Sequence, residues 1–327
     1  MSFVHLHNHS NYSLLDGLSK IKLMVAKAKR LEMPALALTD HGNLYGAIDF
    51  YKTCTAAGIK PIIGIEAYIA LRQRFDKEAN IDNKRFHLTL LATDKTGYQN
   101  LIKLVTAANL EGYYYKPRMD KELLRQHHQG LICLSGCMAS ELGRALGAGD
   151  NRLAEQVVRE HQEIFGAENY WLEIMHHPKI EGQLTIKQAT INLARRLKLP
   201  LVATQDCHYL EPDEARAHDI VVAIGTHSDN ENNKRFSNQD EDFSFIDRAT
   251  AERYFSDTPE ALEATLEIAA RCHLELEFGR WVFPNFALPA GADIDQTITR
   301  MAQARLAAYL KNNSPRRAEA GARIERE

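Results

Sequence analysis

The sequence of 327 residues lacks the features of several protein classes. It has no run of 18 apolar residues that could cross a membrane, and its first ten residues, MSFVHLHNHS, cannot form the apolar centre of a signal peptide. Its five cysteines are odd in number and widely scattered, which is typical of reduced thiols and not of a disulfide framework. We therefore expect a cytoplasmic protein with no membrane partner.

The sequence also has no excess of positive charge. Lys and Arg number 40 against 43 Asp and Glu, so any contact with nucleic acid must be local. No G-x-G-x-x-G or P-loop pattern follows an apolar run, which removes the main support for a dinucleotide or nucleoside-triphosphate site. Histidine, in contrast, occurs 14 times, and three copies fall within five residues.

Short β-rich apolar runs alternate with stretches of helical period over much of the chain. This alternation predicts repeated βα units around a parallel sheet, and it favours a closed or nearly closed barrel over an open doubly wound sheet. Helices are expected at Ser19–Leu31, capped by Ser19, and at Asn43–Ala57, ended by Gly58. The predicted strands are Phe3–His7, Ala35–Thr39, Pro61–Ile69, Phe86–Ala92, Gly130–Ser135, Tyr170–Met175 and Leu199–Thr204.

The C-terminal part has a different composition. A polar stretch without periodicity, Ser228–Asp242, predicts a long surface loop. We expect one domain over residues 1–278. Residues 279–327 are expected to form a connector and the truncated start of a following region, in which Asp293 caps a helix.

The densest group of ligand-type side chains is His5-Leu6-His7-Asn8-His9 on the first predicted strand. Alternation along a strand places residues 5, 7 and 9 on one face. Such polar residues would each need a buried partner in an apolar core, whereas a shared metal site at one rim of a barrel satisfies all of them. Further candidates stand at or near the ends of other predicted strands, namely Asp40, His41, Glu66, His87, Cys137, Asp206 and His208.

Six segments of the chain resemble successive motifs of the polymerase and histidinol phosphatase (PHP) domain. The form they resemble stands at the N-terminus of bacterial DNA polymerase III alpha subunits. That resemblance, over residues 3 to about 275, implies a distorted (β/α)7 barrel of the α/β class, here with a C-terminal helical extension. The segments are HLHNHSNYSLLDG, ALTDHGNLYGA, GIEAYIA, FHLTLLATDKTGYQNL, LSGCMASE and ATQDCHYL.

The same resemblance implies a cluster of three divalent metal ions, with zinc as the expected metal and manganese or iron as alternatives. His9, Glu66 and Asp206 are expected to carry catalysis, with Glu66 bridging two ions. None of the nine positions departs from a residue that can bind a metal. The nine implied ligands are His7, His9, Asp16, His41, Glu66, His87, Cys137, Asp206 and His208.

The function implied is metal-dependent 3′→5′ exonuclease action on the 3′ end of a DNA primer strand. The polymerase active site is expected outside this chain, and the rest of the polymerase subunit is the expected partner. Two alternatives remain open. One is a free-standing PHP phosphatase acting on a small phosphate ester, and the other is a catalytically silent module that docks a separate proofreading exonuclease.

Several other residues have two interpretations. His5 is expected behind the metal ligands, and Asp40 either orients an imidazole or caps a helix. Unassigned histidines such as His127 and His218 match no motif and are expected to be solvated or structural. The stretch Tyr113–Arg118 (YYYKPR) either stacks bases and contacts phosphates of a single strand or is an ordinary loop.

Overall fold

The computed structural model describes residues 3–226, 240–281, 286–288, 290–309 and 316–326. The chain divides into two units, Met1–Leu276 and Glu277–Glu327, which are described separately. The predicted loop Ser228–Asp242 lies mostly outside the described residues. No helix in the described ranges is long and apolar enough to cross a membrane.

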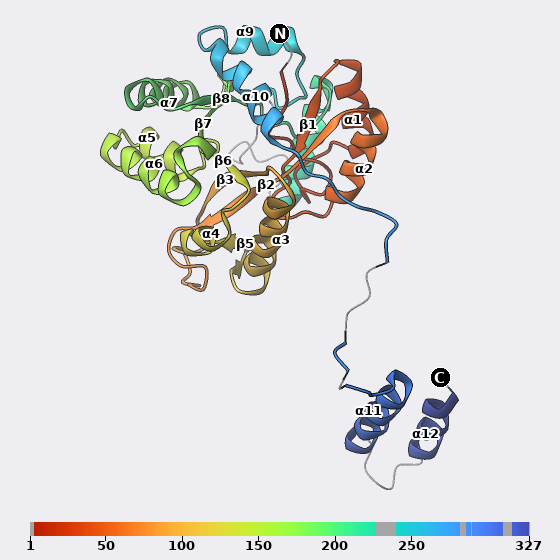
Figure 1. Cartoon of the computed structure of the whole chain (residues 1–327). Helices are drawn as coiled ribbons and strands as arrows, with labels where there is room; N and C mark the ends of the chain where they lie inside the picture. Colours follow the sequence, from red (N-terminus) through yellow and green to blue (C-terminus); the bar gives the residue numbers. More distant parts are fainter. Residues whose placement is uncertain (1–2, 227–239, 282–285, 289, 310–315, 327) are drawn as a thin grey trace. The chain divides into compact units, whose positions relative to one another are not determined.

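The first unit is built on one strongly curled sheet with helices on its outside (Figure 1). The hydrogen-bonded order is β4-β5-β2-β3-β6-β7-β8, and β1 pairs in parallel with the first half of β2. β5 pairs with the far end of β2, so the β4–β5 hairpin extends the sheet at that end. The strands are β1 (Ala35–Leu38), β2 (Lys60–Ala70), β3 (Arg85–Ala92), β4 (Tyr113–Tyr114), β5 (Lys116–Met119), β6 (Leu131–Leu134), β7 (Tyr170–Ile174) and β8 (Leu201–Ala203).

The N-terminal segment closes the sheet into a barrel. On one side, the amides of Ala37 and Thr39 donate to the carbonyls of His5 and Asn8, each at 3.0 Å. On the other side, the His9 amide donates to the Cys207 carbonyl at 2.8 Å, just beyond β8. The first predicted strand therefore occupies a strand position in the ring, although its pairing is irregular. The predicted barrel of the α/β class is confirmed.

One strand runs against the predicted direction. β3 pairs antiparallel with both β2 and β6, whereas repeated βα units would make every strand parallel. The cause is local, because residues 71–84 between β2 and β3 contain no helix to carry the chain back along the sheet. The reversal brings the beginning of β3, with His87, to the rim where the other strands end.

The helices surround the sheet and begin where side chains satisfy their free backbone amides. Asp94, Asp120, Ser140 and Asp150 each accept a hydrogen bond from the amide three residues ahead. Ser19 makes no such bond, because its helix begins later with Lys20 as the N-cap. The helices are α1 (Ile21–Arg30), α2 (Ala47–Ala57, ended by Gly58 at φ +76°), α3 (Lys95–Leu110), α4 (Lys121–His127), α5 (Glu141–Gly147), α6 (Asn151–Phe165), α7 (Gln183–Leu197), α8 (Ala215–Gly225), α9 (Arg248–Tyr254) and α10 (Pro259–Arg271).

Two apolar clusters hold the barrel together. The larger one joins the outer faces of the strands to the helices. The smaller one collects side chains from the N-terminal segment and from β1, β2, β3, β6, β7 and β8, together with α10 residues such as Ile268. Val4 donates its amide to the Thr265 hydroxyl of α10 at 3.0 Å, so this helix covers one end of the ring. The polar rim therefore forms the opposite, open end.

The second unit contains α11 (Ile294–Tyr309) and α12 (Arg316–Arg326). Asp293 caps α11, as expected, by accepting a hydrogen bond from the Gln296 amide at 2.9 Å.

Candidate metal centre

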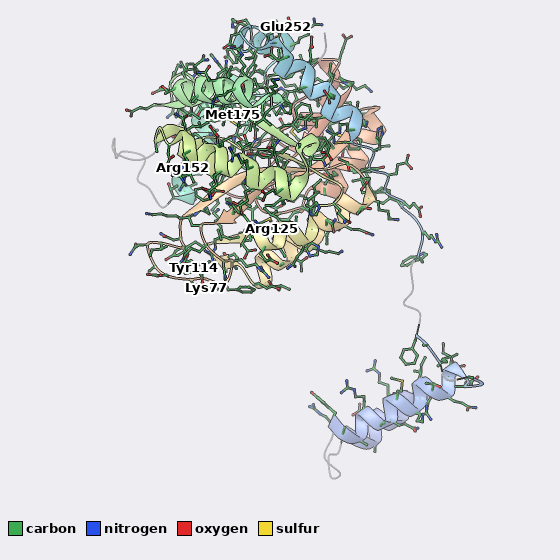
Figure 2. The ribbon with its side chains drawn as sticks, turned by 60° about the vertical axis from the view of Figure 1, so that its left-hand side comes forward. Lys77, Tyr114, Arg125, Arg152, Met175 and Glu252 are labelled. Carbon is green, nitrogen blue, oxygen red and sulfur yellow. The ribbon has the colours of Figure 1, made fainter. Side chains whose placement is uncertain are left out.

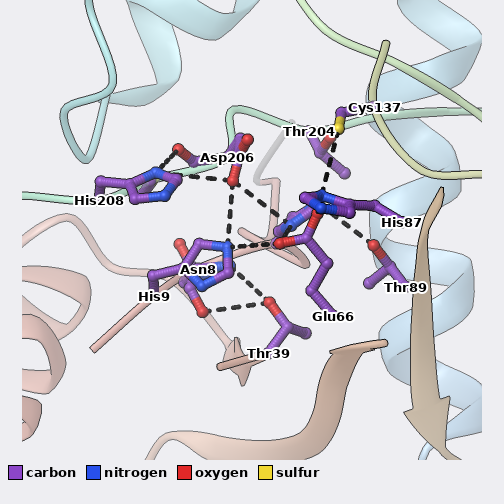
Figure 3. Close-up of polar contacts among 12 residues, drawn as sticks. Asn8, His9, Thr39, Glu66, His87, Thr89, Cys137, Thr204, Asp206 and His208 are labelled. Carbon is purple, nitrogen blue, oxygen red and sulfur yellow. Dashed lines mark hydrogen bonds and ion pairs between the residues drawn. The ribbon is translucent and has the colours of Figure 1, made fainter. Parts of the chain in front are cut away.

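Four side chains meet at the open end of the barrel with one donor atom each. The Nε2 atom of His7 lies 3.5 Å from Glu66 Oε2 and 3.4 Å from Asp206 Oδ1. The Nε2 atom of His9 lies 3.2 Å from each of the same two oxygens (Figure 3). A tetrahedral ion with ligands at about 2.1 Å has edges of about 3.4 Å between its ligands. The four atoms thus have the spacing of a metal-binding cage.

These same four atoms are buried and have no hydrogen-bond partner outside the cluster of ligand-type side chains. An unpartnered polar atom in a protein interior costs roughly 1–3 kcal/mol, so four of them facing one point need a common partner. A divalent cation satisfies two imidazole nitrogens and two carboxylate oxygens at once. The donor set therefore fits a metal ion.

The second ring nitrogen of each histidine, Nδ1, makes a hydrogen bond to another side chain. His7 Nδ1 donates to Glu173 Oε1 at 2.8 Å, and Glu173 has no solvent-exposed side-chain surface. His9 Nδ1 donates to the Ser13 hydroxyl at 2.9 Å, and this hydroxyl donates to Asp40 Oδ1 at 2.8 Å. Each Nδ1 thus carries the proton, which leaves the lone pair of each Nε2 directed at the cage.

Glu66, from the middle of β2, connects the cage to a second group. Its Oε1 lies 2.7 Å from His87 Nδ1, and Cys137 Sγ lies 3.9 Å from that same nitrogen. Its Oε2 also lies 2.7 Å from His41 Nδ1. Glu66, His87 and Cys137 form a separate group of three converging ligand atoms. The position of Glu66 between these groups is the one expected of a bridging carboxylate.

Asp16 is the centre of a third group. Its two oxygens lie 2.8 Å from His41 Nε2, 3.3 Å from His208 Nε2 and 3.1 Å from His218 Nε2. His208 Nδ1 donates to the carbonyl of Asp206 at 2.8 Å, which fixes its other nitrogen toward Asp16. The His218 side chain comes from α8 and extends the group beyond the residues implied by the resemblance.

Charges in the cluster shift the pKa values of its members. Burial raises the pKa of Asp206, but the imidazoles of His7 and His208 outweigh burial and hold this pKa well below its usual range. Burial lowers the pKa of His208, but the carboxylates of Asp16 and Asp206 raise it overall to about 9. Burial raises the pKa of the Cys137 thiol, and Glu66 and Asp206 raise it further. Without a cation nearby, this thiol therefore holds its proton.

The backbone at Asp206 is unusual. Its φ angle is +56°, a conformation that costs a non-glycine residue on the order of 1 kcal/mol. The turn places Cys207 on the other side of the chain, where its Sγ lies 3.4 Å from His5 Nδ1. Strain at this point directs the Asp206 carboxylate to the rim.

The structure brings all nine implied ligands into one connected cluster. His5 does not join them, contrary to the strand alternation, because its Nε2 donates to the Ile246 carbonyl at 3.0 Å and its ring packs on Phe245. Asp40 acts through Ser13, and so it orients an imidazole. Sequence reasoning did not find Glu173, Ser13 or the position of His218.

The cluster opens into a cavity of about 630 Å³. Its inner wall contains side chains from each of the three groups, namely Asp16, His41, Glu66, His87, Cys137, Asp206, His208 and His218, while His7 and His9 lie behind them. Its outer wall contains exposed aromatic and aliphatic side chains, among them Leu14, Tyr45 and Tyr115. A substrate larger than a phosphate group can therefore reach the cluster.

Known proteins that are similar to this chain include subunits of bacterial DNA polymerases. The chain is 43% identical over 290 residues to DNA polymerase III subunit alpha of Treponema pallidum, and 42% identical over 312 residues to that of Thermus aquaticus. These alignments cover 88% and 89% of this chain but 25% and 24% of the relatives, so the chain spans about a quarter of their length.

Among solved structures, a Bifidobacterium adolescentis protein described as a metal-dependent phosphoesterase superposes with a TM-score of 0.43. The sequence identity is 12%, over 78% of this chain and 96% of that chain. The model of the PHP domain family matches residues 5–177, more than half of the sequence. On the strength of that match, the chain belongs to the PHP domain family.

Proposed function

We propose that this chain is a metal-dependent phosphoesterase that removes nucleotides from the 3′ end of a DNA strand. The relatives named DNA polymerase III subunit alpha support DNA as the substrate and replication as the setting. Since those relatives are about four times as long, we also propose that residues 279–327 lead into the rest of a polymerase subunit, which contains the polymerase active site.

The proposed centre holds three divalent ions, with zinc as the expected metal. His7, His9, Glu66 and Asp206 hold the first, Glu66, His87 and Cys137 the second, and Asp16, His41 and His208 the third. When bound, such ions lower the pKa of water and neutralise phosphoryl oxygens that gain charge during hydrolysis.

The protein groups around the centre fix the protonation states that this chemistry needs. Glu173 keeps the proton of His7 on Nδ1, and Ser13, oriented by Asp40, does the same for His9. Both Nε2 atoms are thereby available to an ion without a proton having to leave. The carboxylate of Asp206 stays ionised because neighbouring imidazoles lower its pKa, so it contributes negative charge over the whole neutral pH range.

The unpartnered four-atom cage is the observation that carries this proposal. A silent structural role is less well supported, because structural metal sites are closed, whereas catalytic sites keep an open side. Here the side chains of Asp206, His87 and Asp16 retain 14%, 21% and 29% of their exposure, and the cavity reaches them.

The direct test is digestion of a duplex with a recessed, labelled 3′ end. We expect the Asp206→Asn variant to lose activity by orders of magnitude, because one oxygen of the cage becomes an uncharged amide group. His127→Ala is the matched control, since His127 ends α4 and does not line the cavity, and its activity should stay within a few-fold of the parent. If Asp206→Asn digests DNA as fast as the parent, the proposed centre is not the nuclease.

A further inference from the structure

The outer wall of the cavity contains side chains that phosphoester hydrolysis alone does not require. Tyr45, Tyr113 and Tyr115 line it and are 64%, 55% and 66% exposed. Exposed large aromatic side chains gathered at one cavity mark a binding surface. None of them belongs to the three metal-ligand groups, so they are available to contact another part of a substrate.

The hairpin that carries two of these tyrosines is held firmly in place. Tyr115 alone joins β4 to β5, with a left-handed φ of +61°. Arg118 of β5 is fully buried and donates to the carbonyls of Gly112, Asp82, Arg74 and Asp76 at 2.7–3.1 Å. The place of Arg118 in YYYKPR suggested a contact with phosphates. Because its side chain is buried, Arg118 instead anchors the hairpin.

The same hairpin lies directly beside the proposed metal ligand His41. The next residue, Gly42, has φ of +61°, and a Cβ atom there would lie 3.0 Å from Pro117 and 3.1 Å from the Tyr68 ring. The Tyr68 ring in turn stacks on His41, with ring centroids 5.6 Å apart. A contact chain thus runs from the metal cluster through Tyr68 to the hairpin, whose residue Tyr114 lies at the edge of the first unit (Figure 2).

Two positive charges accompany this surface. Lys116 Nζ lies 5.6 Å and Arg85 Cζ 5.2 Å from the centroid of the Tyr68 ring, and both residues line the cavity. Among the described residues no carboxylate forms an ion pair with either cation, and the Arg85 guanidinium donates to the Asn83 carbonyl at 3.0 Å. Tyr68 itself is buried, but the two cations line the same cavity as the exposed rings of Tyr113 and Tyr115. Cations and exposed aromatic rings on one surface are the combination that binds single-stranded nucleic acid, because rings stack on bases while cations contact phosphates.

We propose that the β4–β5 hairpin, with Tyr113 and Tyr115, is a base-stacking subsite that delivers an unpaired 3′ end of DNA to the metal cluster. The inference rests on the proposed function and specifies its substrate. Bases in a duplex are already stacked and paired, so only unpaired terminal nucleotides can present a free face to the tyrosines. Lys116 and Arg85 contact the phosphates of the same strand. A frayed or mispaired end is therefore preferred over a paired one.

Binding of two single strands of equal length tests the proposal. One is a fluorescein-labelled thymidine strand with a phosphorothioate at its last linkage, and the other is the same strand without bases. By fluorescence anisotropy, we expect the metal-loaded chain to bind the thymidine strand roughly tenfold or more tightly than the abasic strand. The double variant Tyr113→Ala/Tyr115→Ala should lose most of this preference and keep its affinity for the abasic strand.

Two further variants separate stacking from charge and from general damage. Lys116→Ala should weaken the binding of both strands by a similar factor, because each strand has the same phosphates. Tyr309→Ala removes a tyrosine of the second unit that is 89% exposed, and it should keep the full preference. Equal affinity of the parent for both strands, or an unchanged preference in the double variant, would overturn the proposal.

Hydrolysis of an unmodified thymidine strand then distinguishes this proposal from the function on which it rests. A base preference in binding without release of nucleotides supports the stacking subsite and contradicts the phosphoesterase. Release of nucleotides at equal rates from strands with and without terminal bases overturns the subsite and leaves the phosphoesterase standing.

Discussion

Replacing Glu173 by Gln should lower the affinity of the centre for zinc without changing the arrangement of its side chains. The carboxylate accepts hydrogen bonds from His7 Nδ1 and the Thr204 hydroxyl on one oxygen, and from the Gly136 amide at 3.0 Å on the other. Gln has only one oxygen. The Gly136 backbone amide can only donate, so that oxygen must face it, and the Gln amide group must face His7.

His7 can accept this new hydrogen bond only by moving its proton from Nδ1 to Nε2. Because Nε2 is the nitrogen that faces the cage, the protonated form cannot bind an ion. Loss of a group that orients a metal-binding histidine typically lowers metal affinity or activity 10- to 100-fold, or about 1.4–2.8 kcal/mol. We expect a loss in this range for zinc affinity, measured by competition with a fluorescent chelator, and a parallel loss in nuclease rate.

The matched control is Glu155→Gln, the same change at a surface carboxylate that pairs with Arg196. It should leave zinc affinity unchanged, because exposed ion pairs contribute little and Glu155 lies outside the cavity. Circular dichroism should show the same secondary structure for both variants and the parent. Zinc affinity of Glu173→Gln within twofold of the parent would refute the assignment of Glu173 as the group that orients His7.

Three further predictions follow from the same cluster. Removing the metals with a chelator should lower the melting temperature by about 5–10 °C, because ligands from most strands lose their common partner and binding at 100 times the dissociation constant is worth about 2.7 kcal/mol; an unchanged melting temperature would contradict this linkage. In the metal-free chain, burial lowers the pKa of His208 but Asp16 and Asp206 raise it overall from 6.5 to about 9. The protonated His208 imidazole therefore stabilises the folded chain fully below pH 6.5, and this stabilisation is lost as the pH rises through about 9. Chemical denaturation should show the metal-free chain losing stability between these values while the loaded chain does not. A flat profile for both forms would count against the ion pairs. Replacing Cys137 by Ser should reduce the bound zinc by one ion per chain in elemental analysis, since a hydroxyl is a poor zinc ligand, whereas Cys133→Ser, a change of the buried thiol on β6, should retain all of it; equal metal content in the two variants would remove Cys137 from the set.

Residues that belong to a local pattern could be placed from the sequence. His7 and His9 alternate on one segment, and Asp206 and His208 do the same beyond β8, so alternation alone indicates that each pair shares a side. Apolar runs predicted six of the observed strands, since a buried strand needs such a run whichever way it points. The direction of β3 was harder to predict, although the absence of helical periodicity between residues 71 and 84 was a signal that could have been used.

Residues that act from outside such patterns could not be placed. Glu173 is a single acid in the apolar run YWLEIM, and its only signal is that a buried carboxylate in such a strand needs a partner. His218 comes from α8, whose position over Asp16 depends on tertiary packing. The base-stacking role of YYYKPR remained ambiguous because sequence does not show that Arg118 is buried and Tyr115 exposed.

The proposed metal centre at the rim of the barrel is built from three groups of side chains. Elemental analysis of the purified chain after mild dialysis tests it most directly. The nine ligands, with Glu66 shared, predict close to three divalent ions per chain, mostly zinc, and fewer in Asp206→Asn. A parent chain that retains no more than one tightly bound ion would contradict a centre of three ions.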